Sequence, residues 1–108
     1  MDTHKIDFII PYYNTDRFCL ERLADSYANL KNNECCSLYL INDGSNMLTS
    51  TYVHHYFKFF NTYFLNMKIN SGPGLARNFG ILQTKSPLLF FIDSDDYFIN
   101  IDLIDICL

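Results

Sequence analysis

The sequence predicts an α/β fold: an open, Rossmann-like parallel sheet in which strands alternate with helices. Four apolar runs stand at fairly regular intervals, and each is followed by turn residues and a segment of helical character. The first and last runs are apolar almost throughout, which is typical of strands that helices cover on both faces. The chain has 108 residues, 49% of them hydrophobic, so we expect one domain that spans residues 1–108.

The expected elements follow one another in a single βα series. The four predicted strands occupy residues 6–10, 37–41, 64–69 and 88–92. The first helix begins near Asp16, whose acidic side chain can cap free amides, and ends within residues 31–33. Its apolar positions, at spacings of three and four, are Leu20, Leu23 and Tyr27.

Three further helices complete the predicted series. The second covers residues 47–60, and the last begins at Ile101. The third covers residues 74–83, where the spacing of apolar residues predicts that Leu75, Phe79 and Leu82 are buried.

Composition excludes several classes of function. The net charge of -4 provides no basic surface for nucleic acid. The four cysteines form no CxxC pair, which favours a reduced, cytosolic setting. His54 and His55 are adjacent and would point in different directions, so they predict no zinc site.

The expected location is the cytoplasm, including the inner face of the membrane. No stretch approaches the roughly 18 apolar residues of a membrane span. The N-terminus also lacks the basic region followed by an apolar region that a signal peptide has. The chain is nevertheless rich in aromatic residues, with 10 Phe and 8 Tyr. Part of that surface is available for contact with a partner protein or a membrane edge.

Unusual residues follow all four predicted strands. Because ligands bind at the carboxyl ends of the strands in an open parallel sheet, these segments are the candidates for a functional site. In chain order they are Pro11-Tyr12-Tyr13-Asn14, Asn42-Asp43-Gly44-Ser45, Asn70-Ser71-Gly72-Pro73-Gly74 leading to Arg77, and Asp93-Ser94-Asp95-Asp96.

The last of these segments is an acidic cluster that predicts a divalent-cation site. Three neighbouring carboxylates repel one another unless a positive charge lies between them, and oxygen ligands suit Mg²⁺ or Mn²⁺. If strand geometry persists to Asp95, Asp93 and Asp95 project on the same side while Asp96 begins the turn. The alternative is that these acids cap the following helix and face solvent.

The other segments offer hydrogen bonds and close backbone approach. Gly72 and Gly74 let the backbone approach a ligand, and Arg77 adds a permanently charged donor, although the segment also fits a simple helix-starting turn. Asp43 is placed to accept hydrogen bonds from a base or a sugar. No alternating strand follows it, which argues against a hairpin, and Asn14 also fits a helix cap.

Together these segments resemble the glycosyltransferases of family two, enzymes of the GT-A fold that transfer a sugar from a nucleoside-diphosphate donor. The resemblance runs from Ile6 to about Leu103. The matching motifs, in order, are Ile-Ile-Pro-x-Tyr-Asn, Asn-Asp-Gly-Ser, Asn-x-Gly-x-Gly-x-Ala-Arg-Asn-x-Gly and Phe-Ile-Asp-Ser-Asp-Asp.

The resemblance implies a nucleotide-sugar site with a bound Mn²⁺ or Mg²⁺. Asp43 would recognise the base, and Arg77 would lie near the nucleotide. Asp93 and Asp95 would form the DxD motif at the ribose and the metal, with Asp95 and Asp96 as metal ligands. The implied donor-site residues are Pro11, Tyr12, Asn14, Asp43, Gly72, Arg77, Asp93 and Asp95.

The donor implied is a nucleoside-diphosphate sugar, with uridine-linked sugars as one candidate. The acceptor is a saccharide or a lipid-linked molecule that the sequence does not specify. The family also suggests polysaccharide biosynthesis.

Two departures limit what the resemblance implies. Asn42 stands where the family often has an aspartate, which lowers the charge but keeps hydrogen bonding. The chain also stops one helix after the DxD motif, before the acceptor-binding strands and the catalytic base of the family. We therefore expect the donor-binding half of a truncated GT-A domain, with no catalytic residue assigned.

Two alternatives remain beside the transferase. One is a non-catalytic module that binds a nucleotide sugar, alone or with a partner subunit. The other, a phosphorelay receiver, needs acids after the first strand, where this chain has Pro11-Tyr12-Tyr13.

Overall fold

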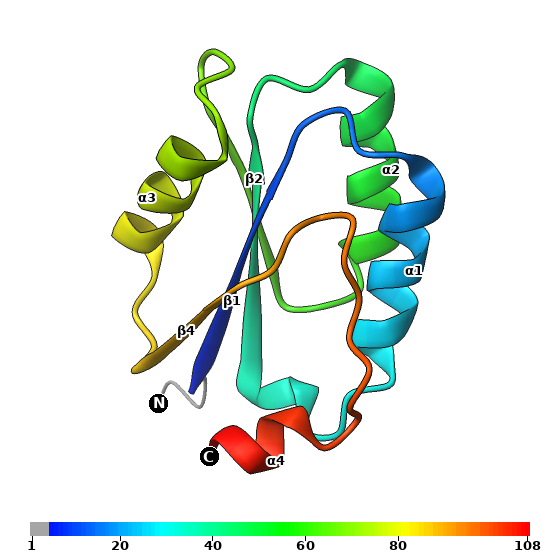
Figure 1. The fold of residues 1–108 in the computed structure, drawn as a ribbon, viewed down its shortest axis with the longest axis vertical. Helices are drawn as coiled ribbons and strands as arrows, with labels where there is room; N and C mark the ends of the chain where they lie inside the picture. The colour runs from blue at the N-terminus through cyan, green and yellow to red at the C-terminus, as the bar shows by residue number, and fades with distance from the viewer. Residues whose placement is uncertain (1–4) are drawn as a thin grey trace.

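The computed structural model describes residues 5–108, and within them it shows a parallel sheet with helices on both faces (Figure 1). The strands, in the spatial order β3-β2-β1-β4, are all parallel to their neighbours. Their bounds are β1 Ile6–Tyr12, β2 Cys36–Asn42, β3 Thr62–Asn66 and β4 Leu88–Phe91. The helices are α1 Arg17–Ala28, α2 Met47–Phe57, α3 Pro73–Gln83 and α4 Leu103–Cys107, with a single 3₁₀ turn at Asn33–Cys35. The predicted α/β class is confirmed.

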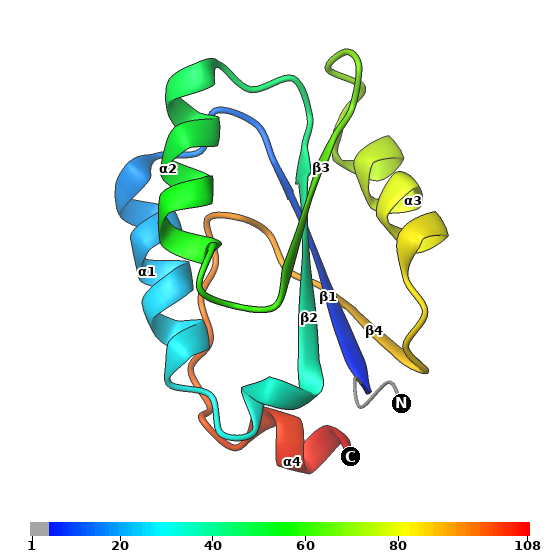
Figure 2. The same ribbon diagram turned by 180° about the vertical axis from the view of Figure 1, so that it is seen from behind.

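The sheet separates two hydrophobic cores, because side chains of β1 alternate between its faces. Phe8 and Ile10 face α1 and α2, where Leu23 and Phe57 pack against them. Ile9 faces α3 and packs with Ala76. Figures 1 and 2 show α1 and α2 on one face of the sheet and α3 on the other.

The predicted third strand is wrong in its position along the chain. The prediction covered residues 64–69, whereas β3 pairs with β2 from Thr62 to Asn66. One further hydrogen bond joins the Met67 amide to the Asn42 carbonyl, after which the chain leaves the sheet and Ile69 is exposed. The end of β2 sets the end of β3, and an apolar run alone does not reveal that limit.

The predicted buried face of α3 is also wrong. Leu75 and Leu82 are exposed and Phe79 is partly buried, while Ala76 and Gly80 form the buried face. These two residues are four apart and lie on one side of the helix. A Cβ atom on Gly80 would lie 2.7 Å from Ile9 Cγ2, so the missing side chain allows α3 to approach β1 closely.

The starts and ends of α1 and α2 differ in detail from the predictions. The Asp16 side chain makes no capping hydrogen bond, and its backbone carbonyl accepts from the Leu20 amide instead. At the start of α2, the Asn46 side chain does cap the helix by accepting from Thr49 N. Both helices end earlier than predicted, at Ala28 and Phe57. None of the helices in residues 5–108 has the length and apolar composition that crossing a membrane requires.

A buried carboxylate fixes the connection between α3 and β4. Asp7 lies within β1 and is 1% exposed. Its Oδ2 accepts from the backbone amides of Lys85 and Ser86, at 3.2 and 3.1 Å, and its Oδ1 accepts from Ser86 Oγ at 2.8 Å. This role was not predicted from the sequence, because the partners of Asp7 lie almost 80 residues away along the chain.

We expect Asp7→Asn to destabilise the fold by about 1–3 kcal/mol, because an amide has one acceptor oxygen and turns its NH₂ group toward backbone donors. Urea unfolding followed by circular dichroism measures the change. Asp25→Asn on the exposed face of α1 is the matched control and should leave the midpoint unchanged. Equal stability of the two variants would contradict the structural role of Asp7.

Candidate functional site

The segments after β1 and β2 are joined by hydrogen bonds at one edge of the sheet. The Asn14 amide donates to Ser45 Oγ at 2.9 Å, and Asn14 Oδ1 accepts from the Asn46 amide at 2.8 Å. Asn14 has a φ of 48°, which places it in the left-handed region that Asn tolerates better than most residues. It therefore holds the turn before α2 and does not cap the helix that follows it in sequence.

Asp43 connects the second segment to the third. Its side chain is buried, and its two oxygens accept from the amides of Ser71 and Gly72 at 2.7 and 2.9 Å. Gly44, next to it, has a φ of 82° and passes close to the Asn70 backbone, where a Cβ atom would lie 2.9 Å from the Asn70 nitrogen. Asp43 thus fixes the glycine-containing segment in place.

Asn42 keeps the hydrogen bonding predicted for it. Its Oδ1 accepts from the Ser45 amide at 2.8 Å, and its Nδ2 donates to Ser50 Oγ at 3.0 Å and to Asn66 Oδ1 at 3.1 Å. No strand pairs back after this turn within residues 5–108, and α2 follows directly. An aspartate has no donor for Ser50 or Asn66, which gives the amide a structural advantage here.

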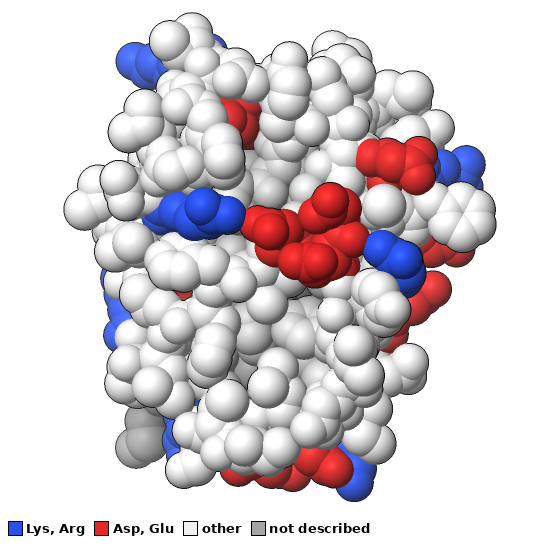
Figure 3. All heavy atoms as spheres, viewed as in Figure 1, with Lys and Arg blue, Asp and Glu red and all other residues white. Residues whose placement is uncertain are grey.

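The acidic cluster forms a tight turn, so strand geometry does not persist to Asp95. β4 ends at Phe91, and the Asp96 amide donates to the Asp93 carbonyl at 2.9 Å, so Asp96 closes the turn. The turn nevertheless brings the three acids together: carboxylate oxygens of Asp93, Asp95 and Asp96 all lie within 4.8 Å of one another, and all three residues are exposed. Figure 3 shows acidic atoms gathered in the middle of this face, with basic side chains on both sides.

Residues of two helices and of the loop before α1 contact the acidic turn. Arg77 of α3 forms an ion pair with Asp93, with Nη2 and Oδ1 2.9 Å apart. Thr15 Oγ1 lies 2.5 Å from Ser94 Oγ, in a hydrogen bond where either hydroxyl can donate. Arg22 of α1 donates to the Asp95 carbonyl at 2.9 Å. The turn is therefore held by groups before α1, within α1 and within α3.

An open cleft of about 580 Å³ lies between these segments. Five of the predicted site residues line it: Pro11, Tyr12, Asp43, Asp93 and Asp95. Four predicted residues are not among its lining: Asn14, Gly72, Arg77 and Asp96. Of these, Gly72 and Arg77 contact lining residues, because they bond to Asp43 and Asp93.

The cleft also contains six residues that were not named individually as site residues from the sequence. Tyr13, Pro73 and Ser94 lie within the segments that follow the predicted strands, whereas Thr15, Asp16 and Cys19 lie outside them. Thr15 and Asp16 directly follow Asn14, so extending that segment by two positions would have found them. Cys19 is different, because it reaches the cleft from one turn inside α1, three residues after Asp16.

The ionisation of Tyr12 suits a neutral hydrogen-bonding role. Burial raises the pKa of its phenol above the ordinary value, and a hydrogen bond with Ser50 opposes this effect only in part. The hydroxyl therefore keeps its proton at neutral pH and can act as a donor and an acceptor.

The fold and the cleft define a class: an α/β protein of the GT-A fold, with a ligand cleft and a carboxylate cluster at the carboxyl ends of its strands. The model of the family described as "Glycosyl transferase family 2" matches residues 7–103. The chain therefore belongs to this family.

Curated relatives support the same assignment. The chain is 32% identical over 100 residues to the "Putative glycosyltransferase EpsH" of Bacillus subtilis, covering 90% of this chain and 28% of the relative. It is 30% identical over 95 residues to the "Poly(ribitol-phosphate) beta-glucosyltransferase" of Bacillus spizizenii, covering 86% of this chain and 15% of the relative. The chain thus spans less than a third of the length of either relative.

Solved structures share the fold. The S. aureus TarS fragment 1-349 in complex with UDP-GlcNAc has a TM-score of 0.84 at 30% identity, covering 95% of this chain and 30% of that one. A mannosyltransferase from Pyrobaculum calidifontis, solved with GDP-Man and Mn²⁺, has a TM-score of 0.83 at 14% identity. The match covers 93% of this chain and 30% of the mannosyltransferase. At that identity the second likeness shows the fold alone.

We expect Asp43→Asn to destabilise the chain by about 1–3 kcal/mol, because one of two backbone donors loses its acceptor. Asp93→Asn, at an exposed position whose side chain pairs with Arg77, should change stability by less than about 1 kcal/mol. Thermal unfolding of both variants measures the difference. The reverse order of stability would show that Asp43 does not fix the third segment.

Proposed function

We propose that this chain is the donor-binding part of a glycosyltransferase that moves a sugar from a nucleoside-diphosphate sugar to an acceptor with the help of a divalent cation. The observation that carries the proposal is the acidic turn, where three carboxylates meet beside a cleft lined by segments after β1, β2 and β4. Membership of glycosyl transferase family 2 supports the same activity.

The composition of the cleft suits a nucleoside next to a charged group. Pro11, Tyr12 and Tyr13 give one part of the lining an apolar and aromatic character, while Asp93 and Asp95 make another part acidic. A base and ribose can lie against the first part, with a diphosphate near the second. In this arrangement Asp43 would recognise the base, through lone pairs that its bonds to Ser71 and Gly72 leave available.

Uridine-linked donors are the first choice among nucleotides. Structures of S. aureus TarS fragments with UDP and with UDP-GlcNAc resemble this chain at 28% and 30% identity. The named activities of related proteins also support a phosphate-containing polymer or a lipid-linked acceptor, as in the poly(ribitol-phosphate) and dolichyl-phosphate glucosyltransferases. Such acceptors would place the chain in polysaccharide assembly at the inner face of the membrane.

The acidic turn fits Mn²⁺ or Mg²⁺. Asp95 and Asp96 would hold the ion, since both carboxylates are exposed and within reach of one another, and these ions complete their shell with water and phosphate oxygens. When bound, the cation would neutralise the charge of the departing nucleoside diphosphate. The P. calidifontis mannosyltransferase with Mn²⁺ supports such an ion on this fold.

The remaining residues bind and orient the donor. Asp93 would contact the ribose, while Arg77, paired with it at 2.9 Å, would lie beside the nucleotide. Gly72 would bring its backbone close to the donor, and Asn14 would position the turn before α2 from the segment after β1. No residue is assigned as the catalytic base, so we propose binding and orientation of the donor by this chain.

We expect Asp95→Asn and Asp96→Asn each to weaken Mn²⁺-dependent UDP binding by at least about tenfold, because each removes an anionic ligand. Isothermal titration of the 108-residue chain with UDP, with and without Mn²⁺, measures this effect. Asp25→Asn is the matched control, since it removes an equal charge from the exposed face of α1. Folded protein that binds UDP equally well with and without Mn²⁺ would exclude the cation site.

Cys19 provides a second test of the cleft. UDP with Mn²⁺ should slow its alkylation by iodoacetamide, because Cys19 lines the cleft. Cys35 is half-buried, lies outside the cleft lining and serves as the internal control for peptide mass mapping. Protection of both cysteines would indicate a change in overall stability, and protection of neither would place the nucleotide elsewhere.

A further inference from the structure

The segment that begins within the acidic turn lies alongside α1 over most of its length, as Figures 1 and 2 both show. We call residues 94–102 the return segment. Four hydrogen bonds join the return segment to α1 or to residues that flank α1. Their order along the return segment is the same as their order along α1. They are Thr15 with Ser94, Arg22 with the Asp95 carbonyl, Ser26 with the Phe98 amide, and the Lys31 amide with the Ile101 carbonyl.

Arg22 is the member of this series that contacts the backbone of the acidic turn. Its Nη2 donates to the Asp95 carbonyl at 2.9 Å, and its guanidinium lies over the Tyr97 ring, 4.3 Å from the ring centroid. A planar guanidinium can satisfy both contacts at once, because its edge donates while its face stacks. Arg22 thus contacts the residues on both sides of Asp96.

We propose that Arg22 is a positioning residue of the cation site: it holds the Asp95–Asp96 peptide so that the carboxylates stay within reach of one ion. This role rests on the proposed function, in which Asp95 and Asp96 hold the cation. Arg22 acts through the backbone, so the two carboxylates remain available as ligands. Arg77 differs in this respect, because it pairs directly with the Asp93 carboxylate.

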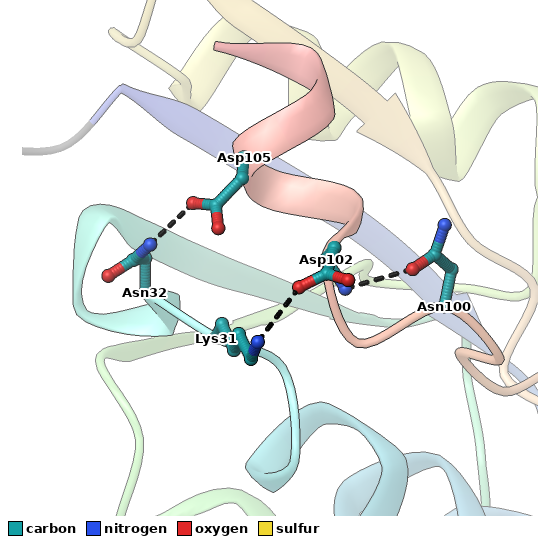
Figure 4. Close-up of polar contacts among 5 residues, drawn as sticks. All are labelled: Lys31, Asn32, Asn100, Asp102 and Asp105. Carbon is teal, nitrogen blue, oxygen red and sulfur yellow. Dashed lines mark hydrogen bonds and ion pairs between the residues drawn. The ribbon is translucent and has the colours of Figure 1, made fainter.

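The far end of the return segment offers a matched comparison (Figure 4). There Lys31 forms an ion pair with Asp102, 3.2 Å from Nζ to Oδ1, and Asn32 bonds to Asp105 of α4. Lys31→Met therefore removes a basic side chain that contacts the same segment, at a point several residues from the acidic turn. A purely structural role for Arg22 predicts that Arg22→Met and Lys31→Met behave alike.

The test compares Arg22→Met, Arg22→Lys and Lys31→Met by electron paramagnetic resonance titration with Mn²⁺ alone. We expect Arg22→Met to weaken Mn²⁺ binding by about tenfold and Arg22→Lys by less, since lysine keeps the charge and a donor but lacks the planar fork. Lys31→Met should bind Mn²⁺ like the original chain. Unchanged or tighter binding by Arg22→Met would overturn the proposal, because loss of a positive charge alone favours the cation.

Amide hydrogen exchange gives a readout that needs no metal. The Asp96 amide, which closes the turn on the Asp93 carbonyl, should exchange at least about fivefold faster in Arg22→Met than in Lys31→Met. Equal exchange in the two variants would overturn the positioning role. A third outcome is that the original chain does not bind Mn²⁺ but the predicted exchange difference is present. This result would contradict the proposed cation site and would still support the contact of Arg22 with the turn.

Discussion

Strand β1 must be covered on both faces and paired on both edges, and the rest of the structure depends on this constraint. All seven of its residues are buried, and it pairs with β2 along its whole length and with β4 over its first four residues. Burial on both faces requires the helix pair α1 and α2 on one side and α3 on the other. Parallel pairing also brings the carboxyl ends of the strands to one edge. The cleft is therefore a consequence of how the chain covers its most buried strand.

The polar residues in and around the cleft divide into those that hold the segments together and those that remain exposed. Asn14, Asn42 and Asp43 bond mainly to neighbouring backbone and side chains, which fixes the segments relative to one another. The carboxylates of the acidic turn have few such bonds and remain exposed. Because the supporting side chains already have their hydrogen-bond partners, a ligand would not need to order these segments. This lowers the entropic cost of binding a small polar molecule.

The sequence predicted the features that depend on local pattern. The apolar runs located β1, β2 and β4, and the residues after them identified much of the cleft. It did not predict the limits of β3, because pairing with β2 sets them. It also assigned the wrong buried face to α3, since leucine spacing carries no information about how closely a helix approaches a sheet.

Partners distant in the sequence account for the other omissions. Asp7 lies in an apolar run and bonds 79 residues away, and Arg22 bonds 73 residues away, so neither stands out in a local motif. The sequence left open whether strand geometry persists to Asp95, and the folded chain has a turn at Ser94 and Asp95. Its closure by the Asp96 amide follows from contacts with α1 and α3 that only the folded chain contains.

The close contact between Gly80 and Ile9 links the position of α3 to the ion pair between Arg77 and Asp93 in the acidic turn. Arg77 lies three residues before Gly80, on the helix whose distance from the sheet this contact sets. A larger side chain at position 80 would tilt or lift the helix and so shift the guanidinium relative to Asp93. The distance between Arg77 and Asp93 can therefore be changed from a position that carries no functional group. Such a change would leave the residues that line the cleft unaltered.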